Sequence, residues 1–151
     1  MSSAEPRRYC TFYLGDECFA LDILAVREVK RRVSITAVRG APPAVRGLLN
    51  LRGQIATVID PAVRLGQPPR ELGASTRLIV LKTCDETGDE LVGLCVDRIA
   101  DVIAIADQEI EAFPCGEEAS TDGLISGVAQ YAGESVRILA PSLLVAARGQ
   151  T

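Results

Sequence analysis

Short apolar runs of β-favouring residues recur along this chain, and turn residues separate them at intervals of roughly eight to twelve residues. The first run, residues 9–14, is followed by the turn Gly15-Asp16-Glu17 and by a second run at residues 18–21, as expected of a hairpin. The same alternation appears at residues 76–83, 91–97, 123–131 and 135–139. Since only brief stretches favour a helix, the chain is predicted to be all-β, as a barrel or a sandwich.

The two halves of the chain resemble each other weakly. Leu14-Gly15-Asp16-Glu17-Cys18 parallels Thr87-Gly88-Asp89-Glu90-Leu91, and a long apolar segment follows each return strand. The chain has 151 residues, of which 48% are hydrophobic and 4% aromatic, so its core must be built from Val, Ile, Leu and Ala. The pattern predicts two similar small barrels.

Two stretches favour a short helix. Residues 61–65 have Asp60 in position to cap the helix, Pro61 at its first position and Gly66 at its end. The second stretch is residues 141–147, near the C-terminus.

Two further predictions concern the segment after the first hairpin. Residues 33–38 alternate between apolar and polar and favour an edge strand. Residues 44–46, which follow the loop formed by Pro42 and Pro43, favour one helical turn.

The stretch from Gly47 to Asp60 contains two apolar runs on either side of a polar break, Asn50 to Gln54. This pattern predicts paired strands with a tight connection, in which Gly53 can adopt a positive φ. An arginine beside such a turn, here Arg52, must extend into solvent or pair with a carboxylate. The residues alone leave both arrangements open.

The composition argues against histidine or metal chemistry. The chain contains no His, which removes His-based triads, His general bases and His metal ligands. Its five cysteines include no Cys-x-x-Cys pair and are expected to be reduced core residues. We therefore expect no catalytic residue, no metal and no cofactor. A small thiol-dependent enzyme that uses one of these five cysteines is the alternative.

Charge is distributed unevenly along the chain. Residues 1–70 carry eleven Lys/Arg and six Asp/Glu, whereas residues 71–151 carry five and fourteen. Such asymmetry favours an oriented protein–protein contact. A basic-face nucleic-acid adaptor is an alternative, but Lys30-Arg31-Arg32 lacks interleaved aromatics and favours a solvated loop. We expect no nucleic-acid partner.

No apolar run approaches the roughly 18–20 residues needed to cross a bilayer. The charged N-terminus is not followed by an uninterrupted hydrophobic region, so no signal peptide is expected. These features predict a cytoplasmic location without direct membrane insertion. The residues together indicate a non-enzymatic binding module, because small barrels commonly receive helices or strands of a partner in apolar grooves.

One stretch connects the chain to a family. Gly47-Leu48-Leu49-Asn50-Leu51-Arg52-Gly53-Gln54-Ile55, followed by Val58-Ile59-Asp60, resembles the signature of CheW-type chemotaxis coupling proteins. Residues 12–17, 20–29, 92–99 and 102–103 also resemble that family, in its order and at its spacing, so the likeness covers nearly the whole chain.

The resemblance implies two SH3-like five-stranded β-barrels that share a hydrophobic region, with short helices and a C-terminal helix. We expect one CheW-like domain of two interleaved barrels at residues 9–147, between a flexible N-terminus (1–8) and a tail (148–151).

The resemblance also implies a scaffold that joins transmembrane, methyl-accepting chemoreceptors to a CheA-type histidine kinase. The cytoplasmic tip of the receptor, a helical hairpin, would lie in the groove between the barrels and recruit the chain to the inner membrane face. A regulatory domain of the kinase, of related fold, would pack end to end against it, and CheW-type chains could form rings. The alternative is an adaptor of a paralogous pathway that controls pili or gene expression.

Carried over residue by residue, the resemblance implies a receptor groove at Val26, Glu28, Val29, Gly47, Arg52 and Gly53. Glu28 and Arg52 would form a partly buried charged pair, whose disruption would cost roughly 3–5 kcal/mol. Kinase contacts are expected at Val38, Arg39, Pro42 and Val45. The chain departs from the family at Arg39 and Ala56, where proline is common, and at Ala140, where an acidic residue is common.

Overall fold

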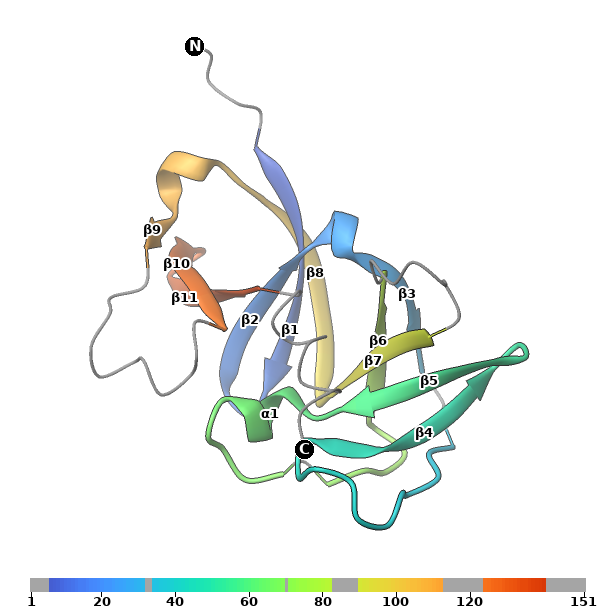
Figure 1. Cartoon of the computed structure of the whole chain (residues 1–151). Coiled ribbons are helices and arrows are strands. Elements are labelled where there is room, and N and C mark those ends of the chain that lie inside the picture. Colours follow the sequence, from blue (N-terminus) through green and yellow to red (C-terminus); the bar gives the residue numbers. More distant parts are fainter. Residues whose placement is uncertain (1–5, 32–33, 70, 83–89, 113–123, 141–151) are drawn as a thin grey trace.

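The computed structural model describes residues 6–31, 34–69, 71–82, 90–112 and 124–140. Within these ranges the chain is nearly all β, which confirms the predicted fold class (Figure 1). The predicted helix at 141–147 and the tail at 148–151 lie outside the described residues. The first strand begins at Arg7, inside the segment expected to be flexible, because Arg7 and Arg8 pair with Ile105 and Ala104.

The described strands form two sheets. Sheet A has the order β8-β1-β2-β11-β10-β9, and sheet B has the order β3-β6-β7-β5-β4. Sheet B has the five expected strands, whereas sheet A has a sixth, the two-residue β9, because Glu111 and Ala112 pair with Val128 and Gly127 on the free side of β10. The bounds are β1 (Arg7–Leu14), β2 (Glu17–Asp22), η1 (Ile23–Ala25), β3 (Val26–Lys30), β4 (Val45–Leu51), β5 (Gln54–Ile59), α1 (Pro61–Arg64), β6 (Arg77–Leu81), β7 (Glu90–Val96), β8 (Arg98–Ile105), η2 (Asp107–Glu109), β9 (Glu111–Ala112), β10 (Ile125–Tyr131) and β11 (Glu134–Leu139).

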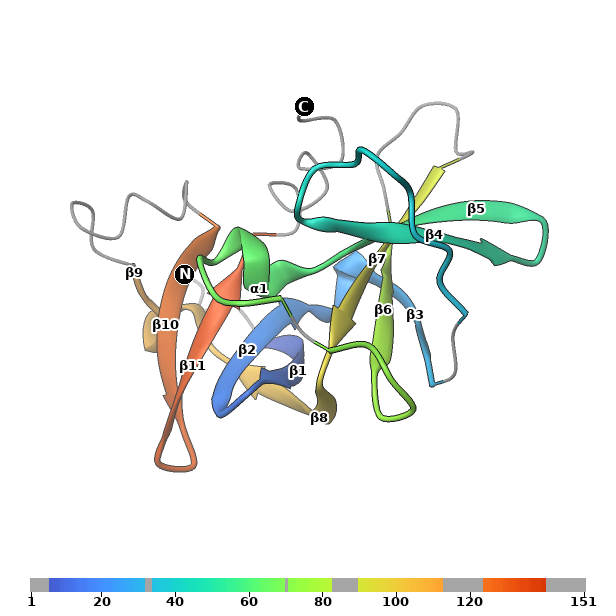
Figure 2. The same ribbon diagram turned by 90° about the horizontal axis from the view of Figure 1, so that it is seen from below.

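Each sheet combines a hairpin from one half of the chain with strands from the other half. The hairpin β1–β2 joins β8 to β11 in sheet A, and the hairpin β6–β7 joins β3 to β5 in sheet B (Figures 1 and 2). The two sheets join their hairpins in the same way, because β2 runs parallel to β11 in sheet A and β7 runs parallel to β5 in sheet B. The weak likeness between the two halves is therefore a structural repeat. The hairpin β1–β2 of the first half belongs to the sheet built by the second half, and the hairpin β6–β7 of the second half belongs to the sheet built by the first half.

The repeat is clearest in the hairpins β4–β5 and β10–β11. Each has a bulge beside a glycine, Gly47 or Gly127. Each closes with a two-residue turn in which both residues have positive φ, Arg52-Gly53 and Ala132-Gly133. The hairpins are built to the same plan, although few of their side chains are alike.

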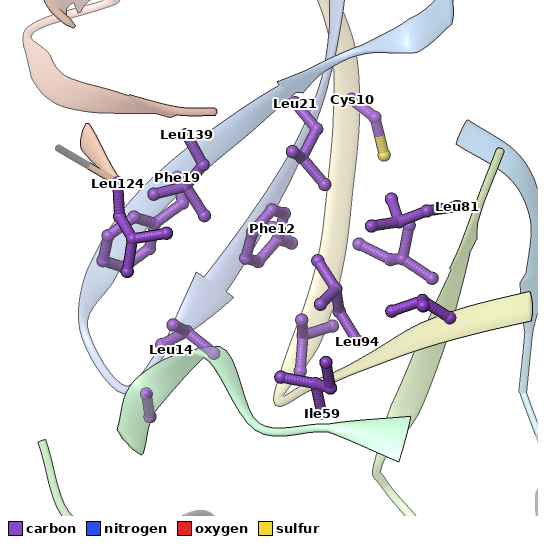
Figure 3. Packing of buried hydrophobic residues seen from close by; sticks show 14 of the residues in the cluster. Cys10, Phe12, Leu14, Phe19, Leu21, Ile59, Leu81, Leu94, Leu124 and Leu139 are labelled. Atoms are coloured by element: carbon purple, nitrogen blue, oxygen red, sulfur yellow. The ribbon is translucent and has the colours of Figure 1, made fainter. Parts of the chain in front are cut away.

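Three apolar clusters hold the sheets together. One cluster lies within each sheet, and the third lies between the sheets and is called the shared core here. The cluster of sheet A joins side chains from β8 and from β10, which are four strands apart, so the sheet must curl around it. Figure 3 shows the shared core, which includes Phe12, Leu14, Phe19, Leu21, Ile59, Leu81, Leu94, Leu124 and Leu139.

The structure corrects two local predictions. Residues 45 and 46 belong to strand β4 and not to a helical turn, because Val45 pairs with Ile59. The edge strand expected at residues 33–38 is reduced, in its described part, to one bridge in which Thr36 and Leu48 exchange two backbone hydrogen bonds of 2.8 Å. The short helix is confirmed, with Asp60 as its cap and Pro61 as its first residue.

Replacing Ala132 with Asn should stabilise the protein. Ala132 has φ 51°, a conformation that costs an ordinary L-residue about 1–2 kcal/mol but that Asn tolerates in a tight hairpin. We expect a gain of about 1 kcal/mol in the free energy of unfolding, which would raise Tm by roughly 2–4 °C. Ala104→Asn, on an exposed position of β8, is the control and should give no gain; equal effects of the two variants would contradict the explanation.

Candidate functional site

An ion pair joins the two edges of sheet B. Arg52 lies in the turn between β4 and β5, and its Nη2 is 2.6 Å from Oε2 of Glu28 on β3. The second oxygen of Glu28 is 3.7 Å from Nζ of Lys30. Since β3 and β4 are the opposite edges of the sheet, its curl brings the tip of the hairpin to the strand that carries Glu28.

The burial of this pair differs from the expectation. The side chain of Arg52 is 66% exposed and that of Glu28 is 22% exposed, so the prediction of a partly buried arginine is wrong. The turn projects beyond the last paired residues of the hairpin, and its side chains therefore reach solvent. A pair this exposed contributes about 0.2–1 kcal/mol to stability, well below the value for a buried pair.

Arg52 also has an unusual backbone conformation. Its φ is 52°, in a turn completed by Gly53, whose N–H donates to Oδ1 of Asn50 over 2.9 Å. This conformation destabilises an ordinary L-residue by about 1–2 kcal/mol, which is more than an exposed ion pair contributes to stability. The strain belongs to the turn and not to the arginine, because Ala132 has φ 51° at the matching position of the β10–β11 hairpin. What distinguishes Arg52 is the positive charge that it presents to solvent beside Glu28.

The other residues of the expected receptor groove fall into two groups. Val29 and Gly53 are exposed, whereas Val26 is half-buried against the shared core. Gly47 is buried, and a Cβ on it would clash with the backbone oxygen of Thr36 and lie 2.7 Å from Cγ2 of Ile35. The structure therefore gives Gly47 a packing role, while a receptor contact of these residues stays a prediction.

Sequence reasoning did not select two exposed apolar residues, one directly before β3 and one on β8 of sheet A. Leu24 of η1, directly before β3, is 75% exposed, and Val102 of β8 is 51% exposed. Both β3 and β8 are edge strands with one residue packed on the shared core, Val26 and Ile99 respectively. The repeat contained a signal for Val102, because Val26-Arg27-Glu28-Val29 matches Ile99-Ala100-Asp101-Val102.

The residues expected to contact the kinase lie in the segment 38–45, at the base of the β4–β5 hairpin. Val38 and Arg39 are exposed, and Pro42 and Val45 are half-buried. The segment is turned by two backbone hydrogen bonds, from Ala41 N to the oxygen of Val38 (3.4 Å) and from Val45 N to that of Pro42 (2.9 Å). Strand β4 separates this base from the tip by roughly 20 Å, at about 3.3 Å per residue. The two sets of residues therefore form separate surfaces.

A buried ion pair that sequence reasoning missed lies beside this base. Oδ2 of Asp60 is 2.8 Å from Nη1 of Arg46, and the carboxylate of Asp60 is fully buried. Its Oδ1 accepts from Ala62 N over 3.0 Å, as the predicted helix cap requires. The sequence indicates the cap through Pro61. It contains no local signal for the partner, because Arg46 lies on β4, fourteen residues before Asp60.

The described cysteines do not support thiol chemistry. Cys10, Cys18 and Cys95 are buried and free. Burial raises the pKa of Cys10 and of Cys18 and, with the negative charge of Asp60, raises the pKa of Cys95 to about 12, so the reactive thiolate is disfavoured in all three. Cys84 and Cys115 lie outside the described residues.

The described residues offer neither a metal-binding cluster nor a helix that could span a membrane. They contain no group of three or more His, Cys, Asp or Glu side chains that could hold a metal ion. In the same ranges, none of the helices has the length and apolar character required to span a membrane.

The chain is similar to known proteins over most of its length. Residues 8–148 match the family described as CheW-like domain. A probable chemotaxis protein CheW of Rhizobium etli is 34% identical over 72% of this chain and 67% of its own length, and the chemotaxis protein CheW of Bacillus subtilis is 30% identical over 85% and 80%. The crystal structure of the scaffolding protein TtCheW from Thermoanaerobacter tengcongensis matches with a TM-score of 0.78 and 31% identity, over 89% of each chain.

Proposed function

Because the chain belongs to the CheW-like domain family, we propose that it is a non-enzymatic scaffold that couples transmembrane chemoreceptors to a CheA-type histidine kinase. The observation that carries the proposal is the turn of the β4–β5 hairpin. There the exposed Arg52 is held by Glu28 at 2.6 Å, and Val29, the next residue of β3, is also exposed, so a fixed positive charge and an apolar side chain are both available to a partner.

The two surfaces of sheet B support a linking role. We assign the receptor to the tip surface, formed by Arg52, Gly53, Glu28 and Val29 with Val26 on the same strand, and we add Leu24, directly before β3, as an exposed apolar neighbour. We assign the kinase to the base surface at Val38, Arg39, Pro42 and Val45. Gly47 supports both surfaces through its packing in β4. Two partners bound at opposite ends of one hairpin would not compete for the same residues, which a scaffold requires.

Co-sedimentation with receptor-bearing membranes tests the proposal. Membranes, kinase and this chain are mixed, and the kinase in the pellet and its autophosphorylation are measured. The chain should increase both relative to the same mixture without it. If neither the sedimented kinase nor its activity increases while the chain is folded, the proposed coupling function is wrong.

Arg52→Ala should weaken receptor binding far more than folding. The substitution removes an exposed ion pair worth about 0.2–1 kcal/mol, so Tm should change by no more than a few degrees. An arginine at the centre of an interface commonly contributes more than 1 kcal/mol, and receptor affinity should therefore fall roughly tenfold. Arg8→Ala, an exposed arginine of sheet A, is the control and should bind normally. Loss of folding with unchanged receptor affinity would contradict the assignment.

A further inference from the structure

Asp60 connects three segments of the chain at the base of the β4–β5 hairpin. Its backbone N–H donates to the oxygen of Ala44 over 2.7 Å. Its buried carboxylate binds Arg46 on β4 at 2.8 Å and the backbone N–H of Ala62 in α1 at 3.0 Å. One residue therefore joins the end of the segment 38–45, strand β4 and helix α1.

The second half of the chain builds the same junction without an ion pair. Ala140 N donates to the oxygen of Leu124 over 2.7 Å, which matches the bond between Asp60 and Ala44. The positions of Arg46 and Asp60 are occupied by Ser126 and Ala140, whose side chains are uncharged. Oγ of Ser126 instead donates to the backbone oxygen of Ile138 over 3.3 Å. The backbone of this junction thus closes without the charges.

The segment at the base is tied to the rest of the protein mainly at its two ends, in addition to the two internal backbone hydrogen bonds described above. The isolated bridge between Thr36 and Leu48 holds its beginning, and the bond from Asp60 to Ala44 holds its end. Between them, Val38 and Arg39 are exposed and lie outside any strand. The orientation of these side chains consequently depends on the turn closed by Ala41 N and the oxygen of Val38, and on how firmly the end of the segment is held.

We propose that Arg46 and Asp60 are positioning residues, whose ion pair holds the segment 38–45 in the conformation that presents Val38 and Arg39 to the kinase. A buried ion pair is a poor source of stability, because desolvation offsets most of its attraction, and its best-attested use is to select one arrangement of the chain. The pair is found at the junction that carries this segment and not at its counterpart. The inference rests on the proposed function, since it concerns the kinase surface assigned above.

The second half of the chain supplies the test variant. Arg46→Ser combined with Asp60→Ala introduces the residues that form the matching junction, so the double variant is expected to fold. Its affinity for the kinase should fall roughly tenfold, its receptor affinity should be unchanged, and the amide of Val45 should exchange hydrogen faster. Arg46→Ser combined with Asp60→Asn keeps an acceptor for Ala62 N and removes only the charges; it should show the same losses. A loss confined to the Asp60→Ala variant would assign the effect to the helix cap and overturn the proposal.

A separate substitution distinguishes this inference from the proposed function. Arg39→Glu reverses the charge of the surface itself and should lower kinase affinity without changing exchange at Val45. If Arg39→Glu weakens kinase binding while both double variants bind normally, the positioning role is overturned and the kinase surface stands. If Arg39→Glu has no effect on kinase binding, the assigned surface is wrong, and the positioning role is overturned with it. Unchanged exchange at Val45 in the double variants would also overturn it.

Discussion

Gly47→Ala should destabilise the protein severely. Thr36 is bridged antiparallel to Leu48, which brings its backbone against Gly47, so a Cβ there would collide with the oxygen of Thr36 and lie 2.9 Å from its carbonyl carbon. These are main-chain atoms, which a rotamer change cannot move. Gly47 also has φ 151°, which side chains rarely adopt. Overpacking and backbone strain cost about 1–3 kcal/mol each, and we expect a combined loss of about 3–5 kcal/mol. Thermal or urea unfolding measures it, with Tm falling by roughly 10 °C or more.

Gly53→Ala is the matched control for this prediction. Gly53 lies in the same hairpin with φ 89°, but a Cβ there meets nothing within 4 Å. The substitution introduces backbone strain without a clash and should lower the free energy of unfolding by about 1–2 kcal/mol. If the two variants unfold at the same temperature, the close approach of the Thr36 backbone is not what requires Gly47. The result would also decide whether a functional defect of a Gly47 variant reflects lost contacts or lost folding.

The local features of the fold could be predicted because they depend on neighbouring residues. The first hairpin, the turn at Gly53 and the cap formed by Asp60 follow from turn chemistry and from alternation within a few positions. The partnership of Arg52 with Glu28 was implied by the resemblance to a family, and the ion pair is present. Their roles toward a receptor remain predictions.

The missed features depend on contacts between distant segments. The exchange of hairpins between the halves leaves no local periodicity, because each strand has the same pattern whichever sheet it joins. Valine favours strands in general, but the place of Val45 in β4 is decided by its pairing with the distant Ile59. The exposure of Arg52 follows from the projection of the turn beyond the sheet, and the burial of Asp60 follows from its place between β5 and α1, where Ala62 packs in the shared core. Tertiary context decided each of these outcomes.

Arg46→Ser alone should cost more stability than the double variant Arg46→Ser with Asp60→Ala. The single substitution leaves the carboxylate of Asp60 buried without the guanidinium 2.8 Å away, a change that costs about 3–5 kcal/mol. Asp60→Ala alone removes a helix cap worth about 1 kcal/mol, but it leaves an arginine that is 23% exposed and can reach water. Because the second half of the chain closes the same junction with Ser126 and Ala140, the double variant should recover a large part of the loss.

Urea denaturation of the protein, the two single variants and the double variant forms a complete thermodynamic cycle. We expect a coupling free energy of about 1.5–3 kcal/mol, since the two side chains touch and share one buried site. The pair Arg7–Asp22, joined at 3.3 Å with the arginine 59% exposed, is the surface control and should couple by less than about 1 kcal/mol. Additive losses at Arg46 and Asp60 would mean that the buried carboxylate does not depend on this arginine. A strong coupling, together with a double variant that folds, would instead separate the cost of breaking the pair from the small net stability that the pair provides.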